Sequence, residues 1–142
     1  MSAHWDRRFL GLARHIAGWS KDPSTDVGAV IALERRVISV GYNGFPRGIA
    51  DDTRLLDRET KLALTVHAEL NAIHNATASV RGATLYTWPM APCQACALQI
   101  IQAGIKRVVA PRGRADHWER WGDSIHAAWD LLAEARVEVD IQ

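Results

Sequence analysis

The stretch PMAPCQACALQII, residues 89–101, contains both cysteines of the chain, Cys93 and Cys96, with two residues between them. Such a C-x-x-C pair serves as a redox dithiol, as half of a structural metal site, or as two ligands of a catalytic metal. The pair alone favours none of the three. The choice depends on which other residues the chain supplies.

The other candidate ligands and the order of the elements weaken two of these interpretations. A structural zinc site normally takes four protein ligands, and the chain has no third cysteine. A site with two histidines would need two well-placed imidazoles, but four of the six histidines fall in the terminal helical segments: His4, His15, His117 and His126. A thioredoxin-like redox pair would favour a position after the first strand of a βαβ unit. This pair follows the third predicted strand.

The remaining interpretation joins the cysteines to His67 and Glu69, which lie in the segment H-A-E. One histidine and two thiolates leave the fourth tetrahedral position open to water, which is typical of a catalytic zinc. Pro92 suits the entry to a helix, whose N-terminus helps to hold both sulfurs as thiolates. Zinc lowers the pKa of a bound water from about 15.7 to about 7, and Glu69 can carry the proton. Taken alone, Glu69 would be a solvent-facing carboxylate in a first helical turn.

The composition is that of an ordinary soluble globular protein. The 142 residues most simply form one domain, residues 1–142, with 48% hydrophobic and 23% charged residues. A net charge of +1 gives no basic field for nucleic acid or for an anionic membrane. The start, MSAHWDRRFLGL, resembles neither a signal peptide nor a membrane span. We therefore expect a cytoplasmic protein, in which a structural disulfide is not expected.

Hydrophobic periodicity predicts alternating helices and strands. Residues 2–19 predict an amphipathic helix, with Ser2 as a candidate cap and an apolar stripe of Trp5, Phe9, Leu12, Ile16 and Trp19. The runs 27–33 and 37–44 predict a β-hairpin, and the polar segment 45–61 predicts a functional or mobile loop with at most a short helical piece. The remaining predicted helices are 67–78, 93–103 and 117–135, and the remaining strands are 83–88, 106–111 and 137–141.

This order of elements predicts an α/β fold with a five-stranded mixed sheet and helices on both of its faces. Five of the six tryptophans lie on the predicted helical stripes and are expected in the core. Trp88 differs, because it lies just upstream of the cysteines.

The pattern H-x-E…P-C-x-x-C is the signature of zinc-dependent nucleobase deaminases. At these residues the chain resembles the cytidine/deoxycytidylate deaminase superfamily, and most closely its deoxycytidylate (dCMP) deaminase branch. The resemblance covers nearly the whole chain and rests on four segments: DPSTDVGAVI (22–31), VISVGYNGFPRG (37–48), HAELNAI (67–73) and PCQACALQIIQAGIKRVV (92–109). It implies a three-layer α/β/α fold of the cytidine-deaminase type.

The same resemblance implies roles for individual residues. His67, Cys93 and Cys96 would hold one Zn²⁺ per chain, and Glu69 would move the protons. Asn43 would hydrogen-bond the sugar, and the backbone around Ala68 and Pro92 would contact the edge of the pyrimidine.

Other polar residues have less specific assignments. The segment GYNGFPRG around Asn43 also fits a simple turn after an edge strand. Nearby residues that suit a 5′-phosphate are Lys21, Ser24, Thr25 and Arg47. A solvated charged face is expected for Arg54, Arg58 and Lys61, and His74 is expected to be packed or capped.

Two features depart from the family pattern. The segment YTWPMAPC carries Trp88 and Pro89 and one extra residue before the cysteines, at the border of the base pocket, so Trp88 is a candidate substrate contact. The segment DDTRLLDRETKLALTV has no cysteine or histidine for the second zinc found in some relatives.

The expected reaction is hydrolytic deamination of a cytosine deoxynucleotide, dCMP to dUMP and ammonia. The enzyme would bind neither a membrane nor nucleic acid. It would be a homo-oligomer, either a dimer or a hexamer. The same residues would also serve a deaminase of 5-substituted dCMP, dCTP, cytosine, guanine, a nucleoside or tRNA adenosine. An alternative of another class is a non-catalytic zinc-binding assembly module, in which Glu69 would have no role.

Overall fold

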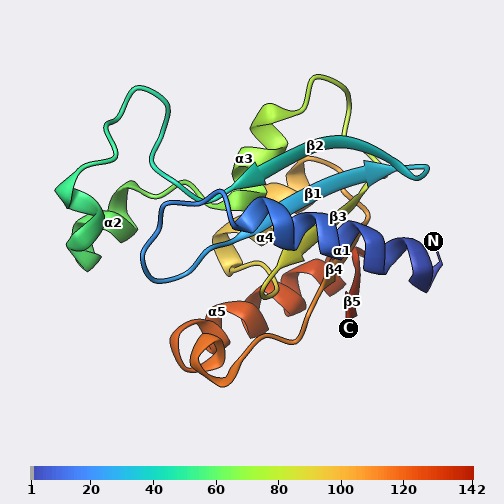
Figure 1. The fold of residues 1–142 in the computed structure, drawn as a ribbon. Coiled ribbons are helices and arrows are strands. Elements are labelled where there is room, and N and C mark those ends of the chain that lie inside the picture. The colour runs from blue at the N-terminus through green and yellow to red at the C-terminus, as the bar shows by residue number, and fades with distance from the viewer. Residues whose placement is uncertain (1) are drawn as a thin grey trace.

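The computed structural model describes residues 2–142 as an alternation of helices and strands (Figure 1). The elements, in chain order, are α1 (Ala3–Ala17), β1 (Gly28–Leu33), β2 (Arg36–Tyr42), the 3-10 turn η1 (Thr53–Leu56), α2 (Arg58–Leu64), α3 (Ala68–Asn75), β3 (Thr84–Trp88), α4 (Gln94–Gln102), β4 (Arg107–Ala110), α5 (Ala115–Glu134) and β5 (Glu138–Ile141).

The strands form one five-stranded mixed sheet in the order β2-β1-β3-β4-β5. Strand β1 runs antiparallel to both β2 and β3, whereas β3, β4 and β5 are parallel to one another. Glu34 and Arg35 join β1 to β2 with positive φ angles of 52° and 64°. Two such residues make the turn that matches the twist of a two-residue hairpin. The predicted hairpin and mixed sheet are therefore confirmed.

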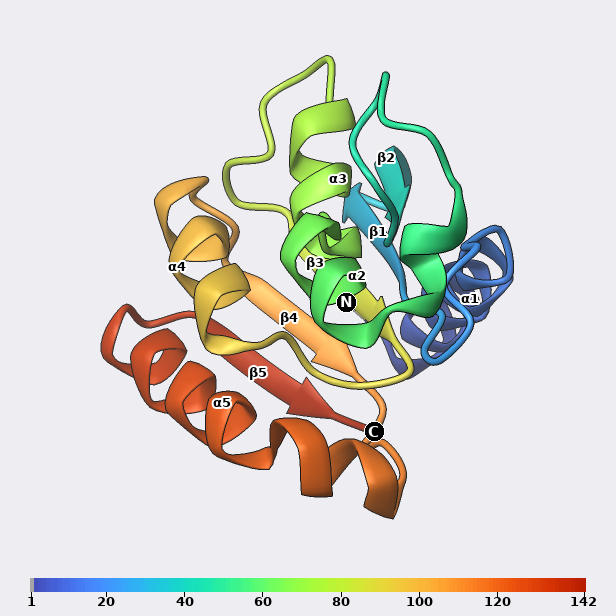
Figure 2. The same ribbon diagram turned by 90° about the vertical axis from the view of Figure 1, so that its left-hand side faces the viewer.

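Side chains alternate between the two faces of the sheet and so divide the core. Ile31, Leu85 and Val108 pack with α3, α4 and α5, whereas Val30 and Tyr86 face α1. Figure 2 shows the sheet between α1 on one side and α3, α4 and α5 on the opposite side. These are the three layers that the resemblance implied.

Helix α3 lies directly on the sheet because Gly41 of β2 has no side chain. A Cβ atom at Gly41 would lie 2.4 Å from the Ala72 nitrogen and 2.5 Å from the Ala68 oxygen. No real contact is that short, so any larger residue at position 41 would push α3 away from the sheet. Gly41 therefore sets the distance between the sheet and the N-terminal part of α3.

Two expectations about the elements are wrong. Helix α1 ends at Ala17, so Trp19 lies beyond it, 53% exposed, and contacts Tyr42 edge-on instead of entering the core. The segment 45–61 is more ordered than a loop, because it contains η1 and most of α2. Within residues 2–142, no helix combines the length and the apolar character needed to span a membrane.

A buried ionic cluster joins α1 to the sheet. Arg107 donates to both carboxylate oxygens of Asp6, at 2.8 and 2.9 Å, and to Asp140 at 2.7 Å. The hydroxyl of Tyr86 donates to Asp6 at 2.8 Å. The Arg107 hydrogen bonds, opposed in part by burial, lower the pKa of the Asp6 carboxyl.

We expect Asp6→Asn to lower the free energy of unfolding at pH 7 by about 3 kcal/mol, because the buried guanidinium loses the carboxylate that accepts two of its hydrogen bonds. A depressed folded-state pKa gives stability that is present above the unfolded pKa and lost as pH falls through the folded pKa. The difference from the wild type should therefore shrink below about pH 4. Urea unfolding at several pH values measures it, with the exposed Asp130→Asn as the control. Equal midpoints for Asp6→Asn and the wild type at pH 7 would contradict the assignment.

Candidate metal centre and its cavity

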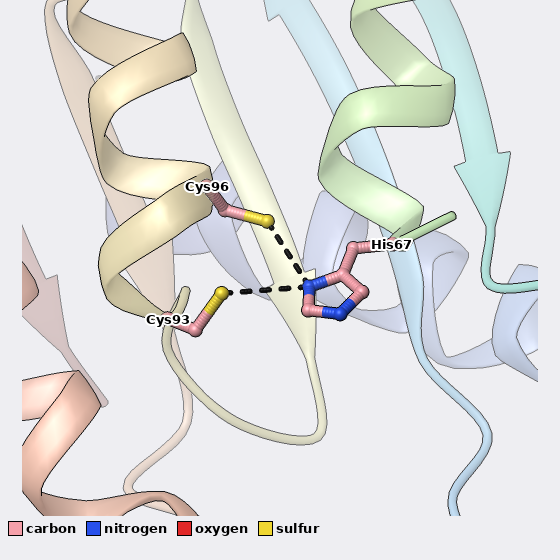
Figure 3. Close-up of side chains that lie close together, drawn as sticks. All are labelled: His67, Cys93 and Cys96. Atoms are coloured by element: carbon pink, nitrogen blue, oxygen red, sulfur yellow. Dashed lines mark hydrogen bonds between the residues drawn. The ribbon is translucent and has the colours of Figure 1, made fainter. Parts of the chain in front are cut away.

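The two predicted motifs meet where two helices begin side by side. His67 directly precedes α3, Cys93 directly precedes α4, and Cys96 lies in the first turn of α4. The His67 Nδ1 atom lies 3.4 Å from the Cys93 sulfur and 3.3 Å from the Cys96 sulfur (Figure 3). Two ligands of one tetrahedral zinc, at the usual Zn–N and Zn–S lengths, are about 3.5 Å apart. The spacing of these atoms thus fits a single zinc ion.

The charges of this group also suit a metal. Hydrogen bonding from Cys96, and secondarily from His67, lowers the pKa of Cys93 to about 4 despite burial. The hydrogen bond between the two sulfurs has the opposite effect on Cys96. Together with burial, it raises the pKa of the Cys96 thiol. The hydrogen bond to Cys93 raises the pKa of His67. A cation that displaces these protons would satisfy all three ligands together, so one Zn²⁺ fits the donor set.

Glu69 lies in the first turn of α3 but does not face solvent. It is 4% exposed, and its burial raises the pKa of its carboxyl despite the nearby positive charge of His67. The interpretation of Glu69 as a solvent-facing carboxylate is therefore wrong. Both Glu69 and His67 line one cavity, which we call the metal-site cavity.

Several segments surround the metal-site cavity. Five of the segments that line it are the chain before β1, the helix α2 with the residues after it, the start of α3, the segment that leads into α4, and one face of α5, and Asn43 just after β2 completes the lining. Of the residues expected to contact substrate, Asn43, Ala68, Ser24 and Thr25 line this cavity.

Four other expected contacts are not placed there. Lys21 is exposed and pairs with Asp51 at 3.0 Å, and Arg47 donates to Asn75 at 2.8 Å on another side of α3. Pro92 lies between two lining residues without lining the cavity itself. Trp88 lies on the α1 face of the sheet, where the Arg14 guanidinium sits 5.2 Å from its ring centre. Trp88 lies on this face because side chains alternate along β3, so that Trp88 points to the same side of the sheet as Tyr86.

Asn43 holds the chain before β1 in shape. Its Oδ1 accepts from the Val27 nitrogen and its Nδ2 donates to the Thr25 oxygen, both at 2.9 Å. The residue is 6% exposed. Asn43 therefore stabilises the local chain and also lines the cavity. Its contact with a sugar stays a prediction.

A buried ion pair is the largest feature of the cavity that the sequence did not indicate. Lys61 Nζ lies 2.8 Å from Asp22 Oδ1, and their side chains are 3% and 8% exposed. Asp22 Oδ1 also accepts from the backbone nitrogens of Ser24 and Thr25. Burial raises the pKa of Asp22, but Lys61 and the two N–H groups outweigh it and lower the pKa. Lys61 was expected on a solvated face, and this expectation is wrong.

Three further cavity residues were missed: Arg58, Arg120 and Trp121. Arg58 had been assigned to a solvated face, and Trp121 to the core. Periodicity gave no signal for them, because a hydrophobic pattern does not distinguish the wall of a cavity from the core, in the case of Trp121, or from solvent, in the case of the two arginines.

Comparisons with known proteins agree with the geometry. Residues 3–111 match the family described as the cytidine and deoxycytidylate deaminase zinc-binding region. The chain is 42% identical over 139 residues to an "Uncharacterized deaminase in luxG 3'region" of Aliivibrio fischeri, covering 98% of this chain and 94% of the relative. It is also 42% identical over 113 residues to the deoxycytidylate deaminase of Mus musculus, covering 74% of this chain and 63% of that protein.

One solved structure shows the same fold along the whole chain. The dCMP deaminase of the cyanophage S-TIM5, in complex with dCMP and dUMP, superposes with a TM-score of 0.84 at 24% identity. The alignment covers 100% of this chain and 99% of that one. The five-stranded sheet and its helical layers are thus those of a known deaminase fold.

Proposed function

The chain belongs to the cytidine and deoxycytidylate deaminase family, and from this premise we propose that it converts dCMP and water into dUMP and ammonia. The observation that carries the proposal is the buried Glu69 carboxyl, two residues after His67 and in the same cavity as His67 and Cys93. The deoxycytidylate deaminases among its relatives support dCMP as the substrate.

The residues divide the chemistry between them. His67, Cys93 and Cys96 would hold a zinc ion, which when bound lowers the pKa of a water molecule and polarises it toward attack. Glu69 accepts a proton from the attacking water and delivers it to N3 of the cytosine ring. The water oxygen bonds to C4, and Glu69 then takes the remaining proton of the new hydroxyl group and passes it to the amino group at C4. The C4–N bond then breaks, ammonia leaves and C4 becomes the carbonyl carbon of dUMP.

The environment of Glu69 suits this work. Burial raises the pKa of the carboxyl, and a raised pKa makes it a better proton donor near neutral pH. Apolar side chains from Ala91, Trp121 and Ile125 line the same cavity. They suit a planar base and limit the access of other water molecules.

Ammonia release from a substrate panel tests the proposal. The panel contains dCMP, CMP, dCTP, deoxycytidine, 5-substituted dCMP, cytosine, guanine and a tRNA anticodon stem-loop. We expect the highest kcat/KM with dCMP. A higher value with cytosine, guanine or the RNA would contradict the substrate assignment. No ammonia from any compound by the zinc-loaded protein would instead support a non-catalytic zinc module.

The same proposal includes a homo-oligomer, a cytoplasmic location and a role in supplying uracil nucleotides. Exposed apolar side chains near the edge strand β2, namely Trp19, Val37 and Tyr42, support the homo-oligomer. Sedimentation as a single chain would contradict that part.

A further inference from the structure

The metal-site cavity is lined by two arginines whose charges no residue in the described part of the chain neutralises. Arg58 of α2 and Arg120 of α5 both line it and are both exposed. Neither guanidinium group has an ion-pair or hydrogen-bond partner among residues 2–142. The third cation of the cavity, Lys61, is neutralised by Asp22 at 2.8 Å. The net charge left at the cavity therefore favours an anionic ligand.

The two arginines approach from different walls. In Figure 2, α2 lies above and α5 lies below the chain segment that enters α4. Both guanidinium groups belong to exposed residues, whereas Glu69 is 4% exposed. The arginines therefore lie toward the solvent side of the cavity and Glu69 lies deep within it.

This arrangement matches the two ends of a nucleotide. A cytosine ring whose C4 lies beside Glu69 directs its sugar and 5′-phosphate away from the metal group and toward solvent. Arginine binds phosphate with two parallel hydrogen bonds, which a point-like ammonium cannot reproduce. The apolar residues Trp121 and Ile125 line the α5 wall of the same cavity, where the ring and sugar can pack.

We propose that Arg58 and Arg120 together bind the 5′-phosphate and so select a nucleotide over a nucleoside. The inference rests on the proposed function and assigns its substrate selectivity to named residues. The Arg58 guanidinium would bind the phosphate from α2 and the Arg120 guanidinium from α5, so that a monophosphate bridges the two helices.

Arg120 lies outside the part of the chain that matches the family model. The match to the family ends at residue 111, whereas α5 spans Ala115–Glu134. All of the metal group lies within the matched part, at His67, Cys93 and Cys96. Substrate choice would therefore depend in part on a helix that lies beyond the zinc-binding region.

A second hollow provides the competing location and the matched control. It is lined by Arg112, Arg114 and Trp88, and it contains neither Glu69 nor a residue of the metal group. Arg114 is paired with Asp116 at 3.1 Å. The Arg112 residue is exposed and its guanidinium has no partner among residues 2–142, so its side chain matches those of Arg58 and Arg120 in charge and exposure but lines another cavity.

The test compares Arg58→Gln, Arg120→Gln and the control Arg112→Gln as zinc-loaded proteins. We measure kcat and KM for dCMP and for deoxycytidine, and calorimetric affinity for dUMP and for deoxyuridine. Each cavity variant should raise KM for dCMP and weaken dUMP binding by about 10- to 100-fold, the loss of a charge-assisted hydrogen bond. Values for deoxycytidine and deoxyuridine should not change, and Arg112→Gln should match the wild type. Glutamine keeps the helix propensity of these exposed positions, so the fold is retained.

Several outcomes would overturn the inference. Wild-type affinity for dUMP in both cavity variants would remove it while the proposed function stands, and a loss in Arg112→Gln alone would move the phosphate to the second hollow. Equal losses for dCMP and deoxycytidine would mean that the arginines do not act through the phosphate. A wild type that does not prefer dCMP over deoxycytidine would contradict the proposed function itself, together with the inference that rests on it.

Discussion

Replacing Glu69 by glutamine should leave zinc bound and reduce turnover by about 10³-fold or more. Glutamine has nearly the same shape and remains at the end of the same helical turn, but it can neither accept a proton from water nor donate one to the ring. General acid–base catalysis contributes about 10²- to 10⁴-fold, and loss of the correct positioning of the reactants adds to it. No other carboxyl lies in this cavity except Asp22, which is bonded to Lys61, so no neighbour can take over the proton.

The measurement is ammonia release from dCMP together with the zinc content per chain. The matched control is Glu59→Gln, an exposed residue of α2 that does not line the cavity. The wild-type and control rates should agree. Turnover by Glu69→Gln within tenfold of the wild type, with zinc present, would remove Glu69 from the mechanism. Because burial already raises the pKa of the Glu69 carboxyl, the neutral glutamine should not lower thermal stability.

Replacing His67 by alanine should abolish both zinc binding and activity. The group has only three protein ligands within residues 2–142, and losing one leaves two thiols that share a proton. Structural zinc in small peptides contributes about 10–16 kcal/mol of apparent binding free energy, so a missing ligand should weaken binding by several orders of magnitude. Zinc should then no longer raise the melting temperature, since a ligand stabilises a protein only by binding its folded state.

His74→Ala is the control for this variant. His74 is exposed and lies near the C-terminal end of the same helix, α3. It does not line the metal-site cavity. It should keep one zinc per chain and normal turnover. If His67→Ala retained one zinc per chain with wild-type affinity, the metal would be held elsewhere, and the assignment of all three ligands would be wrong.

The metal group could be predicted from the sequence because its geometry is local. His67 and Cys93 each directly precede a helix, and Cys96 lies one turn further on, so short motifs determine how the side chains point. Only one long-range fact was needed, namely that the two helices lie side by side. The pairing of the two motifs in one metal site implied it, whereas the predicted order of elements indicated only that helices lie on both faces of the sheet.

The walls of the cavity could not be predicted in the same way. Lys61 lies in a run of alternating charges that is typical of a solvated surface, and its burial depends on Asp22, 39 residues earlier. Lys21 and Arg47 were favoured because they flank candidate loops, yet each has a partner outside the cavity. Arg58 and Arg120 come from segments with no motif. Which cations reach a substrate is decided by tertiary packing, and a single sequence carries no record of it.

The buried pair of Lys61 and Asp22 acts as a non-covalent crosslink. It closes a chain segment that contains both strands of the first hairpin and reaches into α2. Separating the two charges inside a region of low dielectric is costly, so α2 cannot swing away while the chain before β1 stays in place. Opening of this wall would be an all-or-none event in which both segments leave together. Substrate entry would then take place through a mouth of fixed shape, with the side chains at its rim as the moving parts.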